Sequence, residues 1–245
     1  MMRPLQHLLL LASWLWCACI AQAHDLITSE SAERYLTQAQ QRLDVLHARQ
    51  PPAQRAESAF ALGRMLDEIR DLLNRDVAAH GRIQGLSTEY LVRELKRKGL
   101  PLEVAPAVGR FPANVSWYRE ALRIAPEGGH TNDAVFGILQ GEFYDSFDVD
   151  PMQPRSQPWA ALQEQIALGE QLIKRAPAYP EVEEAKFILA VLYTRAARTA
   201  PDRKTGVQYA DRARASIADF QSRYAESMRA AALPVLLQSL EEARR

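Results

Sequence analysis

Apolar residues recur every three or four positions along most of this chain, and no stretch alternates with a period of two for long. This spacing is typical of helices that bury one face, whereas a half-buried strand alternates strictly. The seam from Ala210 to Tyr224 is the clearest, with apolar side chains at 210, 213, 217, 220 and 224. The pattern predicts an all-α fold of about eight or nine helices.

Breaks that contain proline or glycine divide this pattern into segments. Pro51-Pro52 separates two amphipathic helices, which we expect to form an antiparallel pair. A short basic helix over 87–98 and a loop over 99–114 follow, the loop punctuated by proline and glycine. Three more pairs are predicted: 115–125 with 131–145, 159–175 with 180–198, and 202–224 with 226–243.

Seven consecutive apolar residues, Phe187 to Tyr193, are compatible at first sight with a strand, a membrane span or a buried helix. The run is too short for a membrane span, which takes roughly 20 residues. Its flanks, PEVEEA and TRAAR, are good helix formers, and Pro180 suits the first position of a helix. We therefore predict a helix from Pro180 to Arg198 that neighbours cover on more than one side.

The first 23 residues have the composition of a cleavable secretory signal. Arg3 precedes a nearly unbroken apolar stretch from Leu8 to Ile20, and the small residues Ala21 and Ala23 come directly before His24. A membrane anchor would need a longer apolar stretch. We therefore expect residues 1–23 to be a signal peptide, His24 to begin the mature chain, and the protein to be periplasmic or secreted.

Cys17 and Cys19 are the two cysteines of the chain, and both lie inside this segment. Lipidation at either one is an alternative, but neither is preceded by the leucine and small residues of a lipobox. Cleavage after Ala23 would remove both cysteines. The mature chain would then have no disulfide, no thiolate nucleophile and no cysteine-ligated metal.

The charge of the chain is balanced, with 30 basic and 30 acidic residues. A field of one sign over the whole molecule, which would favour nucleic acid or an anionic membrane, is therefore absent from the composition. We expect no nucleic-acid partner, and no transmembrane segment once the signal is cleaved.

Segments of the second half of the chain resemble one another. YPEVEEAKF at 179 aligns with YAESMRAAA at 224, which matches Tyr179 with Tyr224 and Ala185 with Ala230. DAVFGIL at 133 aligns in turn with EAKFILA at 184. The repeated positions are small or aromatic, so the similarity indicates repeated packing between helices.

Glycine beside leucine inside a helix recurs as well, at Gly63 in LGRML and at Gly169 in LGEQL. A glycine in mid-helix costs about 1 kcal/mol relative to alanine. We therefore expect each of these glycines to let a neighbouring helix approach closely.

At these residues the sequence resembles the tetratricopeptide-repeat superfamily, and its bacterial envelope members in particular, such as the outer-membrane assembly lipoprotein and the Tol-Pal coordinator. Phe220, Tyr224, Ser227 and Ala230 match their pattern, whereas Ala225 stands where proline is usual. The repeat is longer than the roughly 34 residues of the standard form. The likeness covers roughly residues 115–243. It implies a solenoid of stacked antiparallel helix pairs that binds a partner without a cofactor.

Two sets of residues are candidates for partner binding. Trp117, Arg119 and Arg123 belong to the first helix of a pair, which lines the concave groove in the repeat family. Arg93 and Arg97 give the short helix a basic end. The alternatives are core packing for Trp117 and a favourable helix dipole for the basic end.

Candidate metal ligands and catalytic residues do not form a motif. His24, His47, His80 and His130 lack the spacing of a metal site. The acidic run Glu142, Asp145, Asp148 and Asp150 is interrupted by Pro151 and Met152, which argues against a calcium loop. No nucleophile elbow, phosphate loop or zinc-protease motif is present. We expect no metal, no cofactor and no enzymatic activity.

The sequence therefore predicts three parts: the signal 1–23, a region 24–113 with one helical pair, the short basic helix and a loop, and a repeat region 114–245. The leading hypothesis is an exported periplasmic scaffold or adaptor that binds a protein or peptide of the cell envelope. The alternatives are a helical envelope enzyme or small-ligand binder that acts on cell-wall or lipid material, and a purely structural spacer.

Overall fold

A computed structural model describes residues 26–105, 109–145 and 158–242 of the chain. The proposed signal peptide and its cleavage site, both cysteines and the linker over 146–157 lie outside these residues. The described residues form helices and one isolated bridge, between Ala105 and Arg110, and include no named strand. The predicted all-α class is confirmed.

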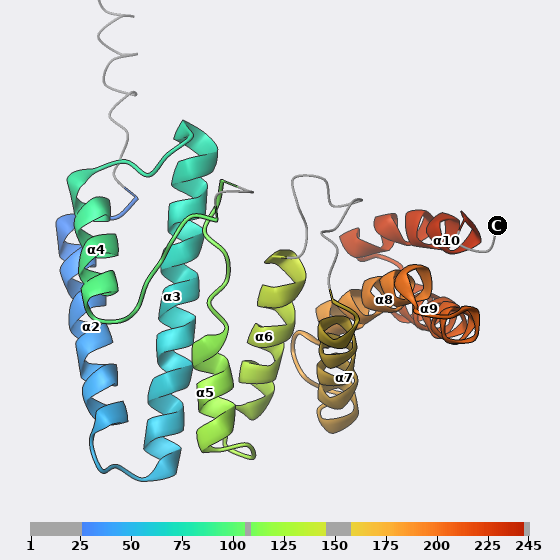
Figure 1. Cartoon of the computed structure of the whole chain (residues 1–245), viewed down its shortest axis with the longest axis horizontal. Coiled ribbons are helices and arrows are strands. Elements are labelled where there is room, and N and C mark those ends of the chain that lie inside the picture. The colour runs from blue at the N-terminus through green and yellow to red at the C-terminus, as the bar shows by residue number, and fades with distance from the viewer. Residues whose placement is uncertain (1–25, 106–108, 146–157, 243–245) are drawn as a thin grey trace, which may run out of the picture.

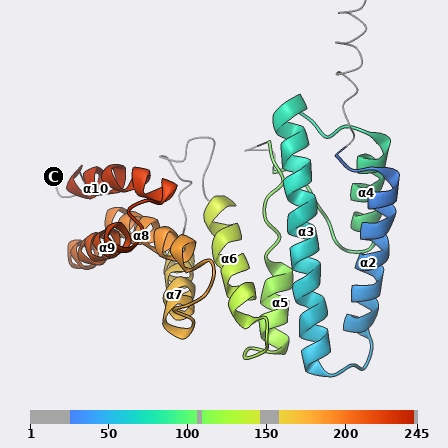
Figure 2. The ribbon, with the colours of Figure 1, turned by 180° about the vertical axis from the view of Figure 1, so that it is seen from behind.

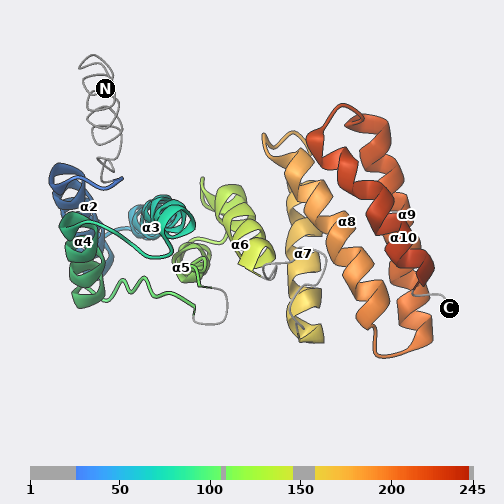
Figure 3. The same cartoon turned by 90° about the horizontal axis from the view of Figure 1, so that it is seen from above.

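The helices follow one another in a row (Figures 1 and 2). Helix α3 packs on α2 and on α5, and each helix from α5 to α9 packs on the next, while α4 lies on α2 (Figure 3). Their bounds are α2 Ser29–His47, α3 Pro52–His80, α4 Leu86–Arg97, α5 Ser116–Ile124, α6 Thr131–Asp145, α7 Trp159–Arg175, α8 Val182–Thr199, α9 Arg203–Arg223, a 3-10 helix Met228–Ala232, and α10 Leu233–Glu242.

Two helix starts differ from those expected. Helix α8 begins at Val182 and not at Pro180, because the Val182 amide donates to the carbonyl of Tyr179 and closes a turn around the proline. The segment expected as one helix over 226–243 is divided. Ser227 caps a short 3-10 helix, and α10 begins at Leu233, which places Pro234 in its first turn, where a missing amide costs little.

The apolar run of α8 is helical, and its side chains from Ile188 to Tyr193 are all buried. The helix packs on α7 and α9, with smaller contacts to α6 and α10. A helix with neighbours on several sides can bury apolar residues around its whole circumference. This explains why the run lacks a polar stripe.

The packing between α3, α5 and α6 depends on one aromatic ring. Tyr118 of α5 is buried, and its ring lies between Gly63 of α3 and Gly137 of α6. A Cβ atom at either glycine would come within 2.8 Å of the ring. Glycine at both positions therefore allows α3 and α6 to contact opposite edges of the same tyrosine.

We predict that Gly63→Ala destabilises the fold, although alanine is the better helix former. The added methyl group meets the Tyr118 ring, and overpacking of this kind costs about 1–3 kcal/mol, which exceeds or matches the gain of about 1 kcal/mol in helix propensity. Urea unfolding followed by circular dichroism measures the change in the free energy of unfolding. Gly129→Ala is the control, since a Cβ there meets nothing within 4 Å. A stabilised Gly63→Ala variant would contradict the packing argument.

Candidate functional site

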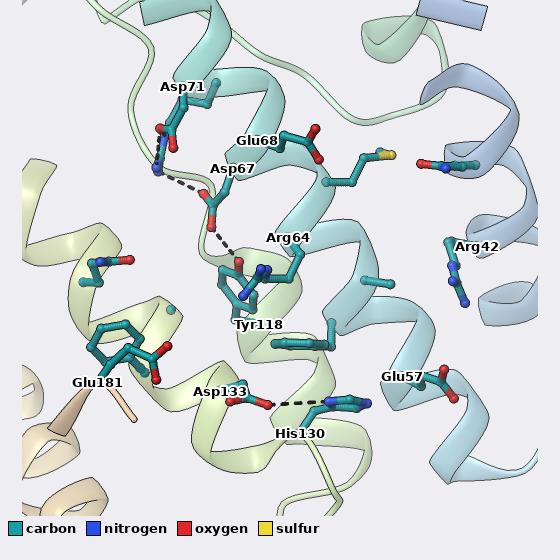
Figure 4. A pocket seen from close by; sticks show the side chains of 18 of the residues that line it. Arg42, Glu57, Arg64, Asp67, Glu68, Asp71, Tyr118, His130, Asp133 and Glu181 are labelled. Atoms are coloured by element: carbon teal, nitrogen blue, oxygen red, sulfur yellow. Dashed lines mark hydrogen bonds and ion pairs between the residues drawn. The ribbon is translucent and has the colours of Figure 1, made fainter. Parts of the chain in front are cut away.

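One face of α3 forms the floor of a large groove, which we call the α3 groove. Its volume is about 1020 Å³, and its walls come from α2, α6 and the turn before α8 (Figure 4). Tyr118 of α5 also lines the floor. The residues of α3 that line it are Glu57, Phe60, Ala61, Arg64, Met65, Asp67, Glu68, Arg70 and Asp71.

The groove continues beyond this volume along the same helix. A second hollow of about 350 Å³ shares Asp67, Asp71 and Gly137 with the first and reaches Asn74 and Phe111. From Glu57 to Asn74, at 1.5 Å per residue, the floor is about 25 Å long. Asn74 holds the neighbouring loop in place, because its side chain exchanges two hydrogen bonds with the backbone of Phe111, at 2.9 and 2.8 Å.

The floor of the groove contains a partly buried network centred on Asp67. The hydroxyl of Tyr118 donates to Asp67 Oδ2 at 2.5 Å, and Arg70 lies 2.9 Å from Asp67 Oδ1. Burial raises the pKa of Asp67, although both partners act in the opposite direction. Burial, followed by the nearby Asp67 carboxylate, also raises the pKa of Tyr118. Both oxygens of Asp67 are thus engaged by the protein itself.

Aromatic rings line the end of the groove near the start of α6. The ring of His130 stacks on Phe60, with centroids 4.6 Å apart and planes 9° apart. Phe136 contacts Tyr179 at 5.7 Å between centroids, and the Tyr179 hydroxyl donates to Asp133 Oδ1 at 2.9 Å. Asp133 Oδ2 lies 3.6 Å from His130 Nδ1, so this carboxylate holds both walls of that end (Figure 4).

The groove is more acidic than the chain as a whole. Three guanidinium groups line it, and Arg70 among them is shared by two carboxylates, Asp67 and Asp71. Glu68 accepts a hydrogen bond from Tyr35 at 2.6 Å, which is a neutral partner. The carboxylates that line the groove number six: Glu57, Asp67, Glu68, Asp71, Asp133 and Glu181.

The arginines proposed from the sequence lie elsewhere. Arg119 bridges Glu142 and Glu164, at 2.5 and 2.6 Å, and so links α5 to α6 and α7. Arg123 pairs with Glu120 on its own helix. Neither lines the α3 groove, whose floor and walls include the second helices of two pairs, α3 and α6.

The remaining candidates of that set also lie outside the groove. Arg93 and Arg97 both pair with Glu94. Trp117 is partly buried against the core formed by α2, α3 and α4. It also lines a smaller hollow together with Leu46. Partner binding at these five residues stays a prediction.

The residues proposed for repeat packing lie in contacts between helices. Gly169 faces Leu189, which a Cβ would meet at 2.8 Å, and Ala185 is fully buried. Tyr224 packs on Phe220, with centroids 5.0 Å apart, and Ala230 packs against the same core. Tyr179 differs from Tyr224, with which the sequence aligns it, because Tyr179 also lines the α3 groove.

Histidines and acidic residues of the described ranges form no group of three or more able to hold a metal ion. His80 bonds to Asp76 at 2.9 Å near the end of α3, and His47 is exposed. Asp145 accepts a hydrogen bond from the Ala113 amide at 2.5 Å, whereas Asp148 and Asp150 lie outside the described residues. Across 26–105, 109–145 and 158–242, no helix is both long and apolar enough to cross a membrane.

Comparison of the chain with protein-family models, with curated proteins and with solved structures finds no match. The resemblance to tetratricopeptide repeats therefore stays a prediction from the residues that carry it.

Sequence reasoning missed the groove because its residues look like a solvated helix face. Glu57, Phe60, Ala61, Arg64, Asp67, Glu68 and Asp71 follow helical spacing but are mostly charged. Phe60 is the large apolar residue among these seven, and a single apolar residue on a charged helix face is common and does not by itself indicate a site.

We predict a specific pH dependence for Asp67→Asn. Because burial raises the pKa of Asp67 in the folded state, the folded protein holds this proton more tightly than the unfolded chain. The contribution of Asp67 to stability is therefore fully present below the ordinary aspartate pKa of about 3.9, and is lost as the pH rises through the raised value. The stability of the unaltered protein minus that of Asp67→Asn should decline over this interval.

Urea unfolding of both proteins between about pH 3.5 and 7 measures this difference. Asp202→Asn is a control with the opposite sign, because hydrogen bonds from the Thr205 amide and hydroxyl lower the pKa of the Asp202 carboxyl at the start of α9. Its difference should shrink as the pH falls. A flat difference for Asp67→Asn would show that the carboxylate is as well solvated as in the unfolded chain.

Proposed function

We propose that this protein is an exported periplasmic adaptor that binds a segment of an envelope protein in the α3 groove. The observation that supports this most is the groove itself, about 25 Å long at helical rise and bounded by four helices and a turn. Its lining runs from Gln38 to Glu181 in the sequence, so segments far apart in the chain contribute to one surface.

The dimensions of the groove suit a peptide better than a small molecule. An extended chain rises about 3.3 Å per residue, so about eight residues span the floor. Small-molecule pockets enclose most of their ligand, and volumes of about 300–1,000 Å³ are usual. The α3 groove lies at the upper end of that range, and its floor is about 25 Å long.

Binding is also better supported than catalysis. Burial raises the pKa of Asp67, and that of Asp145 in the second hollow, which would suggest a catalytic acid. In Asp67, however, Oδ2 accepts a hydrogen bond from Tyr118 of α5, and Oδ1 forms an ion pair with Arg70 of α3. A carboxylate held in this way stabilises the floor of the groove, because it joins α3 to α5.

Site-specific photocrosslinking in cells tests the proposal. A photoreactive residue at Gln41, on the α2 wall, should give an adduct whose mass spectrum maps to one segment of one envelope protein. The same residue at Ala167, an exposed position of α7 outside the groove, is the control. Adding Ala61→Trp, which fills the floor, should remove the Gln41 adduct. Equal adducts at both positions, or an adduct unaffected by Ala61→Trp, would contradict groove binding.

Export is tested separately by the mass of the mature protein. We expect the periplasmic form to begin at His24, because the small residues at 21 and 23 suit signal peptidase. Intact-mass spectrometry of the fractionated protein measures this start directly. A chain that retains residues 1–23, or one that carries lipid on Cys17 or Cys19, would overturn this part of the proposal.

A further inference from the structure

We infer that the segment bound in the α3 groove is cationic and carries an aromatic residue. This inference rests on the proposed function and deepens it. The first part rests on the charge of the lining, and the second rests on the aromatic rings that line one end of the groove.

The excess of negative charge belongs to the groove and not to the molecule. Six carboxylates and three guanidiniums line it, while the whole chain has no net charge. A concave surface with low-dielectric walls concentrates its field, so this excess favours a ligand of positive charge. An acidic segment would have to approach the excess negative charge and would be disfavoured.

The charges are also unevenly distributed along the groove. Glu57, Asp133 and Glu181 lie toward the end formed by the start of α6 and the turn before α8, which we call the acidic end (Figure 4). In the described part of the chain, no arginine or lysine forms an ion pair with any of these three. Arg70, by contrast, lies with its partners Asp67 and Asp71 farther along α3. Asp133 lies beside His130, and Arg42 and Arg64 line the groove as well, so the excess of six carboxylates over three guanidiniums belongs to the groove as a whole.

Aromatic groups accompany these carboxylates. The stacked pair of Phe60 and His130 and the pair of Phe136 and Tyr179 line the same end. Arginine combines a planar stacking surface with a positive charge, and it pairs with carboxylates and aromatic faces together. A neighbouring aromatic residue of the segment can pack on the same rings. The acidic end therefore favours a bound segment in which an arginine or lysine stands next to an aromatic residue.

A library of random octapeptides displayed on phage, selected on the protein purified from the periplasm, tests the inference. The length matches the floor of the groove. We expect the selected peptides to be enriched in arginine or lysine and in tryptophan, tyrosine or phenylalanine. Enrichment of acidic peptides, or of apolar peptides without a cationic residue, would overturn the inference.

Fluorescence anisotropy with one selected peptide then measures its affinity. Glu57→Gln and Glu181→Gln should each weaken binding by about two- to five-fold, the range of exposed ion pairs, and added salt should weaken it further. Glu241→Gln removes the same charge on α10, away from the groove, and should leave the affinity unchanged. Replacing the aromatic residue of the peptide by alanine should also weaken binding. Equal affinity after either kind of change would refute the corresponding part.

The outcomes separate this inference from the proposed function. If the selected peptides lack a positive charge but lose binding in the Ala61→Trp variant, the groove remains the binding surface. That result would refute only the inference that the segment is cationic. Failure to select any peptide sensitive to Ala61→Trp would count against both.

Discussion

The contact of Tyr118 with two glycines is the constraint on which the rest of the structure depends. Because Gly63 and Gly137 have no side chain, α3 and α6 approach the two edges of one buried ring. The hydroxyl of that ring then ends beside Asp67, at the floor of the α3 groove. A larger residue at either glycine would separate the helices and change the width of the groove. The packing of the central helices and the shape of the candidate site are therefore set by the same side chain.

Residues of the groove hold one another in place through contacts across its floor and walls. Its floor is one long helix, and Asp67 links that floor to α5 while Asp133 links the wall residues His130 and Tyr179. Binding to a surface that is already ordered avoids much of the conformational entropy that flexible loops lose. The groove can thus hold an extended segment with moderate contacts, which suits an adaptor better than a site that must close around a reacting group.

Much of the fold could be predicted from periodicity, because each helix buries one stripe that follows local spacing. The all-α class and the helical state of Phe187 to Tyr193 are of this kind. The start of α8 was placed two residues early, since a proline in a turn and a proline at a helix start look alike in sequence. The groove could not be predicted from the sequence, because most of its α3 residues are charged and resemble a solvent-exposed helix face. They form the floor of a groove only because α2 and α6 pack on either side of α3. The sequence predicts that Gly63 lies in a packing contact. Its partner Tyr118 lies 55 positions later in the chain, and only the tertiary structure shows that the two residues meet.

The positions of the arginines separate the stabilising charges from those available to a ligand. Arg119 joins three helices through Glu142 and Glu164, and Arg229 joins the 3-10 helix to Glu183 and Glu184 of α8. In these ion pairs the positive charge lies in contacts between helices. In the groove the carboxylates outnumber the guanidiniums six to three, and in the described part of the chain no arginine or lysine forms an ion pair with the three carboxylates of the acidic end. A chain with no net charge can therefore have an acidic groove, because part of its positive charge lies in contacts between helices.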